Sequence, residues 1–237
     1  MVIGKGMVAR RFASYEKDDR FVIFASGVSN SKNRIIAEYN RETDLLQSII
    51  EAHKEKILVY FSTCSVYDPE EKNSPYILHK YKAENIVQSY SQQFYVFRVS
   101  NLVGKSDNPN TILNFFVYHT VNKINFDLWS NAVRNLVDID DMYRIVDYIL
   151  QDRLYLNQII NVANPSNYKV TEIVKTIEEF WQIEANYVSI AKGSSIPIDL
   201  SIISPIIQKL NIQFEENYLV NLLEKYYKDK WPIDLLY

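Results

Sequence analysis

The sequence predicts an α/β fold in which helices cover both faces of a parallel sheet. Short apolar segments of strand length, FVIFA at residues 21–25 and ILVYF at 57–61, alternate with longer segments whose apolar residues recur at helical spacing. Strands that alternate with helices in this way are typical of a doubly wound parallel sheet. With 237 residues and 47% hydrophobic content, the chain can bury one core, or one core carrying a small lobe, rather than two independent domains.

The expected elements follow in chain order. Residues 1–3 form a very short strand, which leads through a glycine turn into a helix over residues 10–15 and then into a charged loop. Ser74 and Pro75 are an N-cap and a first helical residue, so a helix begins there and runs to about residue 92. The other strands are expected at 21–25, 57–61, 94–99 and 159–162, and the other helices at 34–53, 112–121, 140–150, 171–181, 201–210 and 218–227.

Charge and cysteine content exclude several classes of protein. The net charge of -3 gives no basic field that would attract nucleic acid or an anionic membrane. Cys64 is the only cysteine, which excludes an internal disulfide framework and a cysteine-based zinc site and is usual in a reducing compartment. No apolar run approaches the ~20 residues of a membrane span, and no secretory signal pattern opens the chain. We therefore expect a cytoplasmic protein.

The histidines give no indication of a metal site. His79 is expected on a different helical face from Lys80, and His119 has no carboxylate or cysteine partner at ligand spacing, so we predict no metal. Trp129 is a candidate to line a substrate lobe, although an aromatic residue there is more often part of a core.

Gly4, Gly6 and Ala9 have the spacing of a Gly-x-Gly-x-x-Ala turn between a strand and a helix. Glycines at such a turn let the backbone approach a pyrophosphate, whose negative charge is favoured at a helix N-terminus. On this motif alone, a dinucleotide site and an ordinary tight turn are about equally expected.

Tyr76 and Lys80 are four residues apart in a predicted helix and therefore point the same way. An ammonium beside the phenol would lower the phenol pKa from about 10, so that Tyr76 could take or return a hydroxyl proton. A solvated helical face is the commoner explanation of an isolated pair. Here, however, Thr63 and Asn101 end neighbouring strands, and the carboxyl edge of an open parallel sheet is where ligands bind.

The sequence also resembles the extended short-chain dehydrogenase/reductases, the NAD-dependent epimerase/dehydratase family that acts on nucleotide sugars. The matching stretches occur in family order and cover nearly the whole chain: FVIFASG, EYNRETDLLQSIIEA, ILVYFSTCSVYD, SPYILHKYKAENIV, RVSNLVG, RNLVDIDDM and INVANPSNYKVTEIV. The resemblance implies a Rossmann-type core over residues 1–102 and about 136–162. The substrate-binding lobe is then expected over residues 103–135 and 163–237.

The resemblance also implies a role for each matching residue. Tyr76 is the expected catalytic acid/base, Lys80 the lysine that binds the nicotinamide ribose, and Thr63 the hydroxyl on the reacting oxygen. The expected contacts to NAD or NADP are Gly4, Lys5, Gly6, Met7, Val8, Ala9, Ala25, Ser26, Gly27, Ser62, Tyr76 and Lys80. The expected substrate contacts are Cys64, Ser65, Asn101 and Arg134. Asn101 and Arg134 match residues that usually hold a diphosphate, and a turn asparagine and a surface arginine are the plainer alternatives.

Two departures from the family pattern narrow the prediction. Dehydratases of the family carry an Asp-Glu pair after the catalytic threonine, whereas Cys64 and Ser65 follow Thr63 here, so we expect epimerisation or ketone reduction rather than elimination of water. FVIFASG matches the fourth strand of the family but follows the first helix closely, so two strands on the adenosine side are missing. The residue that separates NAD from NADP is lost with them, and Arg10 and Arg11 are either contacts to a 2'-phosphate or surface charges.

The sequence thus predicts an NAD(P)-dependent nucleotide-sugar ketoreductase or epimerase that carries out hydride and proton transfer at a sugar carbon. The alternative is a non-catalytic dinucleotide- or sugar-nucleotide-binding protein on the same fold. That alternative would explain the lost strands but not the survival of Thr63, Tyr76 and Lys80. By resemblance, a homodimer is expected through the helices at about residues 38–53 and 76–92.

Overall fold

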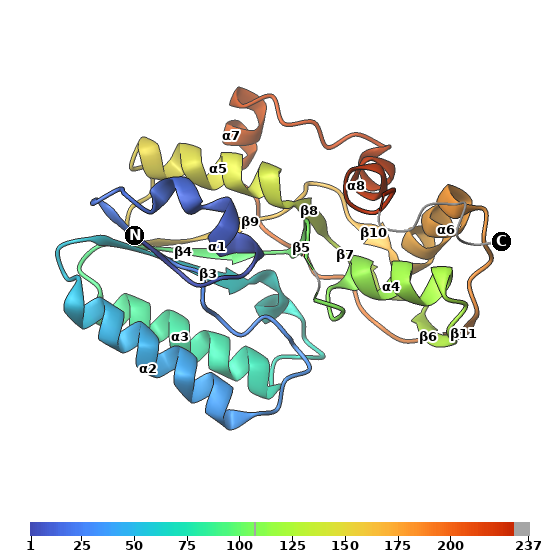
Figure 1. Cartoon of the computed structure of the whole chain (residues 1–237), viewed down its shortest axis with the longest axis horizontal. Helices are drawn as coiled ribbons and strands as arrows, with labels where there is room; N and C mark the ends of the chain where they lie inside the picture. Colours follow the sequence, from blue (N-terminus) through green and yellow to red (C-terminus); the bar gives the residue numbers. More distant parts are fainter. Residues whose placement is uncertain (107, 230–237) are drawn as a thin grey trace.

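The centre of the molecule is a five-stranded parallel sheet with the order β1-β2-β3-β4-β9, which Figure 1 shows in the computed structural model of the chain. The structure describes residues 1–106 and 108–229. The strands are β1 (Val2–Ile3), β2 (Phe21–Phe24), β3 (Ile57–Thr63), β4 (Phe94–Val99) and β9 (Gln158–Val162). Each pair of neighbours is parallel, and the strands coincide with the predicted apolar segments.

Helices cover both faces of this sheet (Figure 1). On one face lie α2 (Ile36–Ala52) and α3 (Pro75–Tyr90), and on the other lie α1 (Met7–Arg11), α5 (Ile139–Gln151) and α7 (Ser204–Lys209). Successive residues of one strand enter different cores, because Leu58 and Tyr60 pack with α2 and α3 whereas Val59 packs with α5. The covered parallel sheet confirms the predicted doubly wound α/β fold.

In the described part of the chain, β1 forms one edge of the sheet and pairs with β2 alone. This is the arrangement expected if two strands are missing on the outer side of β1. The helix predicted at residues 10–15 is displaced: α1 begins at Met7, directly after the glycine turn, and a 3-10 turn (Ala13–Tyr15) follows it. Phe12 and Tyr15 are almost fully buried against the α5 side of the core, which accounts for the tightening of the chain after α1.

A second hydrophobic core lies beyond the carboxyl edge of the sheet, on the right of Figure 1. It is built from α4 (Ile112–Val121), β6 (Phe126–Trp129), α6 (Val170–Trp181) and α8 (Tyr218–Tyr226), and β11 (Tyr187–Ile190) pairs with β6. Two further short pairs, β5 (Asn101–Val103) with β8 (Leu136–Asp138) and β7 (Val133–Arg134) with β10 (Tyr168–Lys169), connect the two cores. The sequence predicts none of these six short strands.

The C-terminal segment touches both cores. Ile206 and Ile207 of α7 belong to the core of the sheet, whereas α8 belongs to the second core. Lys225 of α8 forms ion pairs of 2.7 Å with Asp138 and Asp140 at the start of α5. The predicted division into a Rossmann core and a substrate lobe remains a proposal. None of the helices in residues 1–106 and 108–229 is long and apolar enough to cross a membrane.

Candidate active site

Tyr76 and Lys80 lie in the first turns of α3, beside the carboxyl end of β3. Ser74 fixes the start of this helix, because its hydroxyl accepts a hydrogen bond of 3.3 Å from the Ile77 N–H. Both functional side chains are buried, with 7% of Tyr76 and 3% of Lys80 exposed. The predicted pair therefore faces the sheet edge and not a solvated helical surface.

Two cavities meet at Tyr76. The smaller, of about 380 Å³, lies over the carboxyl ends of β2, β3 and β4, and the larger, of about 540 Å³, extends toward α4 and β6. Thr63 and Lys80 line the smaller cavity, whereas Tyr76 lines both. The two walls also share Ser31, Ser65, Asn101, Asn110 and Ile112. A molecule in one cavity would therefore meet a molecule in the other at the Tyr76 phenol.

Most of the predicted cofactor contacts are found in the wall of the smaller cavity: Gly6, Met7, Val8, Ala25, Gly27, Ser62, Tyr76 and Lys80. Gly4, Lys5, Ala9 and Ser26 are not part of this wall. Gly4 has a φ of 130° and lies so close to β2 that a Cβ atom would be 2.3 Å from the Ala25 carbonyl oxygen. Its place in the motif is thus explained by the turn itself.

The smaller cavity has the chemistry that a nicotinamide dinucleotide requires. A Cβ atom on Gly6 would meet no atom within 4 Å, so the glycine turn borders open space. The hydroxyl of Ser100 is buried in the cavity wall and has no hydrogen-bond partner among the described residues. A buried hydroxyl is normally paired, so this one fits a ligand with polar groups. Lys80 adds a positive charge to the same wall.

The predicted substrate contacts differ in which of the two cavities they line. Ser65 and Asn101 line both cavities, and Arg134 lines the larger one. Cys64 lines neither: its thiol donates a hydrogen bond of 3.1 Å to the Arg98 carbonyl, and burial raises its pKa to about 12. A thiol in this environment is a packing group.

Aromatic rings and charges of the larger cavity complete the site. Trp129 lines this cavity, and the Lys192 ammonium lies 4.2 Å from the centre of its ring. His119 is another wall residue, and the centre of its ring lies 3.9 Å from the centre of the Phe115 ring. Sequence reasoning missed most of the wall, including Lys32, Arg34, Asp68, Glu70, Glu71, Phe115, Phe116 and Phe126. Phe115, Phe116 and Phe126 have a sequence signal in the high density of aromatic residues between 115 and 129, whereas the charged members of the wall have none.

The protonation of Tyr76 differs from the prediction. Burial raises the pKa of the phenol, although Lys80 and a hydrogen bond with the Thr63 side chain both act to lower it. The desolvation of a nearly buried phenolate is thus the larger effect. The prediction that Lys80 gives Tyr76 a lowered pKa is therefore wrong, because the pKa is raised overall. The phenol carries its proton at neutral pH.

Lys80 is engaged by the protein itself. Its ammonium donates hydrogen bonds to Glu42 Oε1 at 3.0 Å and to the Tyr60 hydroxyl at 3.2 Å. His79, predicted on a different helical face, also reaches Glu42, with its Nε2 atom 2.8 Å from Oε2. Neighbouring residues of α3 can converge in this way because Glu42 approaches from α2, between their two directions. Neither Glu42 nor His79 was a predicted site residue.

A second buried ion pair lies behind Ser62. The Arg98 guanidinium contacts both carboxylate oxygens of Glu84, at 2.9 and 2.6 Å, and the Ser62 hydroxyl donates to Glu84 Oε1 at 2.5 Å. The pair joins β4 to α3, and Glu84 also holds the side chain of Ser62, which lines the smaller cavity. Through Ser62, the pair also connects the carboxyl end of β3 to α3.

Arg10 and Arg11, the candidates for a 2'-phosphate, have partners within the protein. Arg10 donates to the Lys5 carbonyl at 3.1 Å, and Arg11 pairs with Asp140 at 2.5 Å and lies 3.6 Å from the centre of the Tyr143 ring. In residues 1–106 and 108–229, no group of three or more His, Cys, Asp or Glu side chains is placed to hold a metal ion.

Comparisons with known proteins identify the family of the chain and solved structures with a similar fold. A sequence model of the NAD dependent epimerase/dehydratase family matches residues 9–163. A search of curated protein sequences gave no match. Among solved structures, dTDP-glucose 4,6-dehydratase from Bacillus anthracis in complex with NAD has a TM-score of 0.70 and 18% identity, covering 98% of this chain and 80% of that one. UDP-glucuronic acid 4-epimerase from Bacillus cereus, in complex with UDP-glucuronic acid and NAD, has a TM-score of 0.71 and 18% identity, covering 96% and 79%. UDP-glucose 4-epimerase from Thermus thermophilus, in complex with NAD, has a TM-score of 0.68 and 16% identity, covering 96% and 81%.

Proposed function

Because the chain belongs to the NAD dependent epimerase/dehydratase family, we propose that it is a nucleotide-sugar ketoreductase or epimerase that works through Thr63, Tyr76 and Lys80. Family membership confirms the predicted resemblance, the enzyme class and a nicotinamide dinucleotide as cofactor. The observation that carries the finer proposal is the place of Tyr76 between two cavities. The smaller cavity would hold the cofactor and the larger one the sugar nucleotide.

Tyr76 and Thr63 would share one oxygen of the sugar. A reduced nicotinamide bound in the smaller cavity would supply the hydrogen and two electrons that reduce a carbonyl carbon. Tyr76 would donate its proton to the carbonyl oxygen, which becomes a hydroxyl, while Thr63 holds the same oxygen by a hydrogen bond. Because burial raises the pKa of Tyr76, the phenol is protonated at neutral pH, as a proton donor to a carbonyl oxygen must be.

The wall of the larger cavity supports a nucleoside diphosphate sugar as the substrate. The wall contains charges of both signs, with Asp68, Glu70, Glu71 and Asp127 beside Lys32, Arg34 and Arg134. The three cationic side chains are candidates to contact a diphosphate, and Phe126 and Trp129 provide apolar surface for a base. The epimerase bound to UDP-glucuronic acid is consistent with this class of ligand. The absence of an acid pair directly after Thr63 favours reduction or epimerisation over elimination of water.

A non-catalytic binding protein is the second candidate, and the position of β1 at the sheet edge favours it. A dinucleotide would be covered by less protein on its adenosine side than in a full sheet. Binding could then be too weak for turnover, or the smaller cavity could serve recognition alone.

Titration with NADH and NADPH, followed by nicotinamide fluorescence, tests the cofactor site. We expect binding of at least one dinucleotide below millimolar concentration. If neither dinucleotide binds at millimolar concentration, the proposed enzymatic function is refuted.

A panel of UDP- and dTDP-sugars and their keto derivatives then tests turnover, with absorbance of the reduced nicotinamide or a change of sugar configuration as the readout. Tyr76→Phe should retain dinucleotide affinity and lose about 100-fold or more in turnover, because it lacks only the proton donor. A Tyr76→Phe variant with unchanged turnover would remove Tyr76 from its proposed role.

A further inference from the structure

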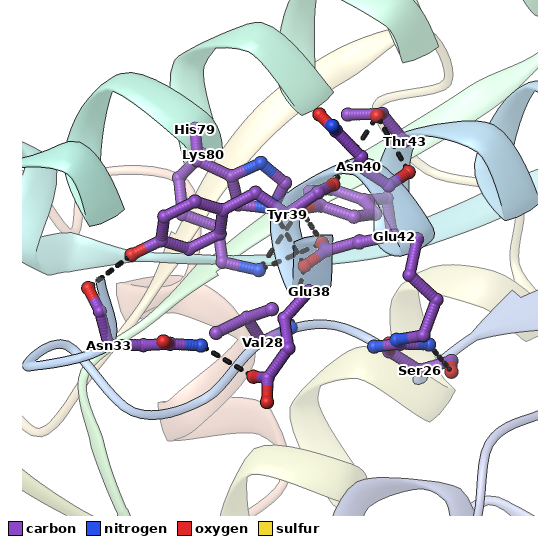
Figure 2. Close-up of polar contacts among 12 residues, drawn as sticks. Ser26, Val28, Asn33, Glu38, Tyr39, Asn40, Glu42, Thr43, His79 and Lys80 are labelled. Atoms are coloured by element: carbon purple, nitrogen blue, oxygen red, sulfur yellow. Dashed lines mark hydrogen bonds and ion pairs between the residues drawn. The ribbon is translucent and has the colours of Figure 1, made fainter. Parts of the chain in front are cut away.

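A buried carboxylate lies directly behind Lys80 without lining either cavity (Figure 2). Glu42 comes from α2 and is 0% exposed. Its Oε1 atom accepts hydrogen bonds from Lys80 at 3.0 Å and from the Tyr60 hydroxyl at 2.7 Å. Its Oε2 atom accepts one from the Val28 N–H at 2.6 Å and lies 2.8 Å from His79 Nε2. Glu42 thus joins α2 to α3, to β3 and to the loop after β2.

These contacts keep Glu42 charged inside the protein. Burial opposes the carboxylate form, but Lys80, His79, the Val28 N–H and the Tyr60 hydroxyl together hold the pKa of Glu42 well below its usual range. A buried ion pair is often no more stable than apolar residues of the same volume. Stability alone is therefore a weak reason for placing a charged pair beside the cavity.

The Lys80 ammonium is held in place, but not all of its N–H donors have an acceptor within the described protein. An ammonium has three N–H donors, and Glu42 and Tyr60 accept hydrogen bonds from it within the described protein. A Cβ atom on Gly27 would lie 2.9 Å from Lys80 Nζ, so bare backbone covers the pair on a third side. Since Lys80 also lines the smaller cavity, its remaining N–H is available to a ligand there.

We propose that Glu42 is a positioning residue that holds the Lys80 ammonium at the wall of the smaller cavity and offsets its charge beside the Tyr76 phenol. The proposal deepens the proposed function and rests on the proton-donor role given there to Tyr76. The offset charge adds to the effect of burial, which already keeps Tyr76 protonated, and the ammonium remains oriented toward a ligand in the cavity. Glu42 acts through Lys80 and touches no reacting atom.

The groups that face Tyr76 come from three elements. From α3 comes Lys80, and from β3 comes Thr63, both of which lower the pKa of the phenol. From α2 come Glu42 and Tyr39, both of which raise it. Tyr60 and His79 contact Glu42 and are held in place by it. Burial has the largest effect on the pKa of Tyr76, and the charges of Lys80 and Glu42 act on it in opposite directions.

Titration of Tyr76 tests this balance without cofactor or substrate, so missing turnover would not affect the result. The phenol is observed by ¹⁹F NMR of protein labelled with 3-fluorotyrosine, and Tyr76→Phe identifies its signal. Glu42→Gln should lower the Tyr76 pKa by about one pH unit, because the Lys80 charge is no longer offset. Glu42→Asp, which keeps the charge, should leave the pKa within about half a pH unit of the parent protein.

Glu38→Gln is the matched control, since Glu38 precedes Glu42 by four residues on α2 but contacts Asn33 instead of Lys80 (Figure 2). It should leave the Tyr76 titration unchanged. The proposal is overturned if Glu42→Gln shows the Tyr76 pKa of the parent protein or a higher one, because a purely structural Glu42 would not lower it.

Removal of Lys80 gives a second test if Glu42→Gln does not fold. Lys80→Met leaves an unopposed carboxylate and should raise the Tyr76 pKa by about one pH unit. The double variant Glu42→Gln/Lys80→Met removes both charges and should return it close to the parent value. Equal Tyr76 pKa values in Lys80→Met and in the double variant would also overturn the proposal.

Discussion

Gly27 packs against the Lys80–Glu42 pair with no side chain between them. A Cβ atom there would lie 2.9 Å from Lys80 Nζ and 3.0 Å from Glu42 Oε1. Gly27→Ala should therefore displace the ammonium and weaken NADH binding by roughly tenfold, or about 1.4 kcal/mol. Fluorescence titration measures the affinity. A variant with parental affinity would show that the site accommodates the methyl group.

Cys64, which follows Thr63 but lines neither cavity, gives a test of burial beside the site. Burial raises its pKa to about 12, so only about one thiol in 10,000 is ionised at pH 8. Reaction with an aromatic disulfide reagent should therefore be very slow in the folded protein and fast in urea. Rapid labelling of the folded protein at pH 8 would mean that Cys64 is open to solvent.

The two halves of the charged pair differ in how far the sequence predicts them. Tyr76 and Lys80 are found from their spacing and from the strand end at Thr63, because local periodicity fixes which way they point. From the local sequence, Glu42 would be predicted as an ordinary exposed charge on a helix. Its burial depends on contacts with α3, β3 and the loop after β2, which local sequence does not encode. The net direction of the Tyr76 pKa depends on the same burial and was therefore predicted wrongly.

At the scale of elements, the Arg98–Glu84 pair joins β4 to α3 behind the site. The Glu84 side chain is 2% exposed and that of Arg98 13%, so loss of one partner leaves a buried charge. Arg98→Met should lower the free energy of unfolding by about 3 kcal/mol. Urea denaturation measures this change. Arg98→Met/Glu84→Gln should recover part of it, because the uncompensated carboxylate is gone.

The exposed pair of Glu51, at the end of α2, and Lys54, in the turn that follows, is the control. Lys54→Met should leave the unfolding midpoint nearly unchanged, because both partners are largely solvated. A loss in Arg98→Met no greater than the loss in Lys54→Met would show that the buried pair adds nothing to stability.

Elements differ in how well the sequence predicts them according to their length and burial. The long helix α2 and the buried strand β3 have enough periodic residues to be located nearly to the residue. Strands such as β7, with two residues, carry no measurable periodicity and exist because another segment lies beside them. The displacement of α1 has the same cause, since Phe12 and Tyr15 are turned by packing against the core.

At the scale of the molecule, the order of elements predicts the sheet. Apolar strands that alternate with helices can bury both of their faces only in a parallel sheet that helices cover on both sides. The wall of the larger cavity was not predictable in this way. It is assembled from α3, α4, β6 and the loops beside them, and their relative placement depends on the second hydrophobic core. The carboxyl edge of the sheet could thus be predicted from sequence, whereas the surface that would select the sugar could not.

The outer face of α2 and α3 leads to a prediction about assembly. Apolar side chains remain exposed there, with Ile36 at 71%, Leu78 at 55% and Tyr81 at 37%. A second copy packed on these helices would remove the apolar surface from water, so we expect a homodimer through this face. Light scattering after gel filtration at several concentrations measures the mass.

Leu78→Asp places a charge in the proposed interface and should shift the protein toward the monomer without changing its fold, because Leu78 is exposed in the single chain. Val188→Asp is the matched control, since Val188 is a 54% exposed apolar residue on β11, which pairs with β6 and is not part of these helices. It should leave the mass unchanged. A parent protein that stays monomeric at every concentration contradicts the dimer, and equal dissociation in both variants would place the interface elsewhere.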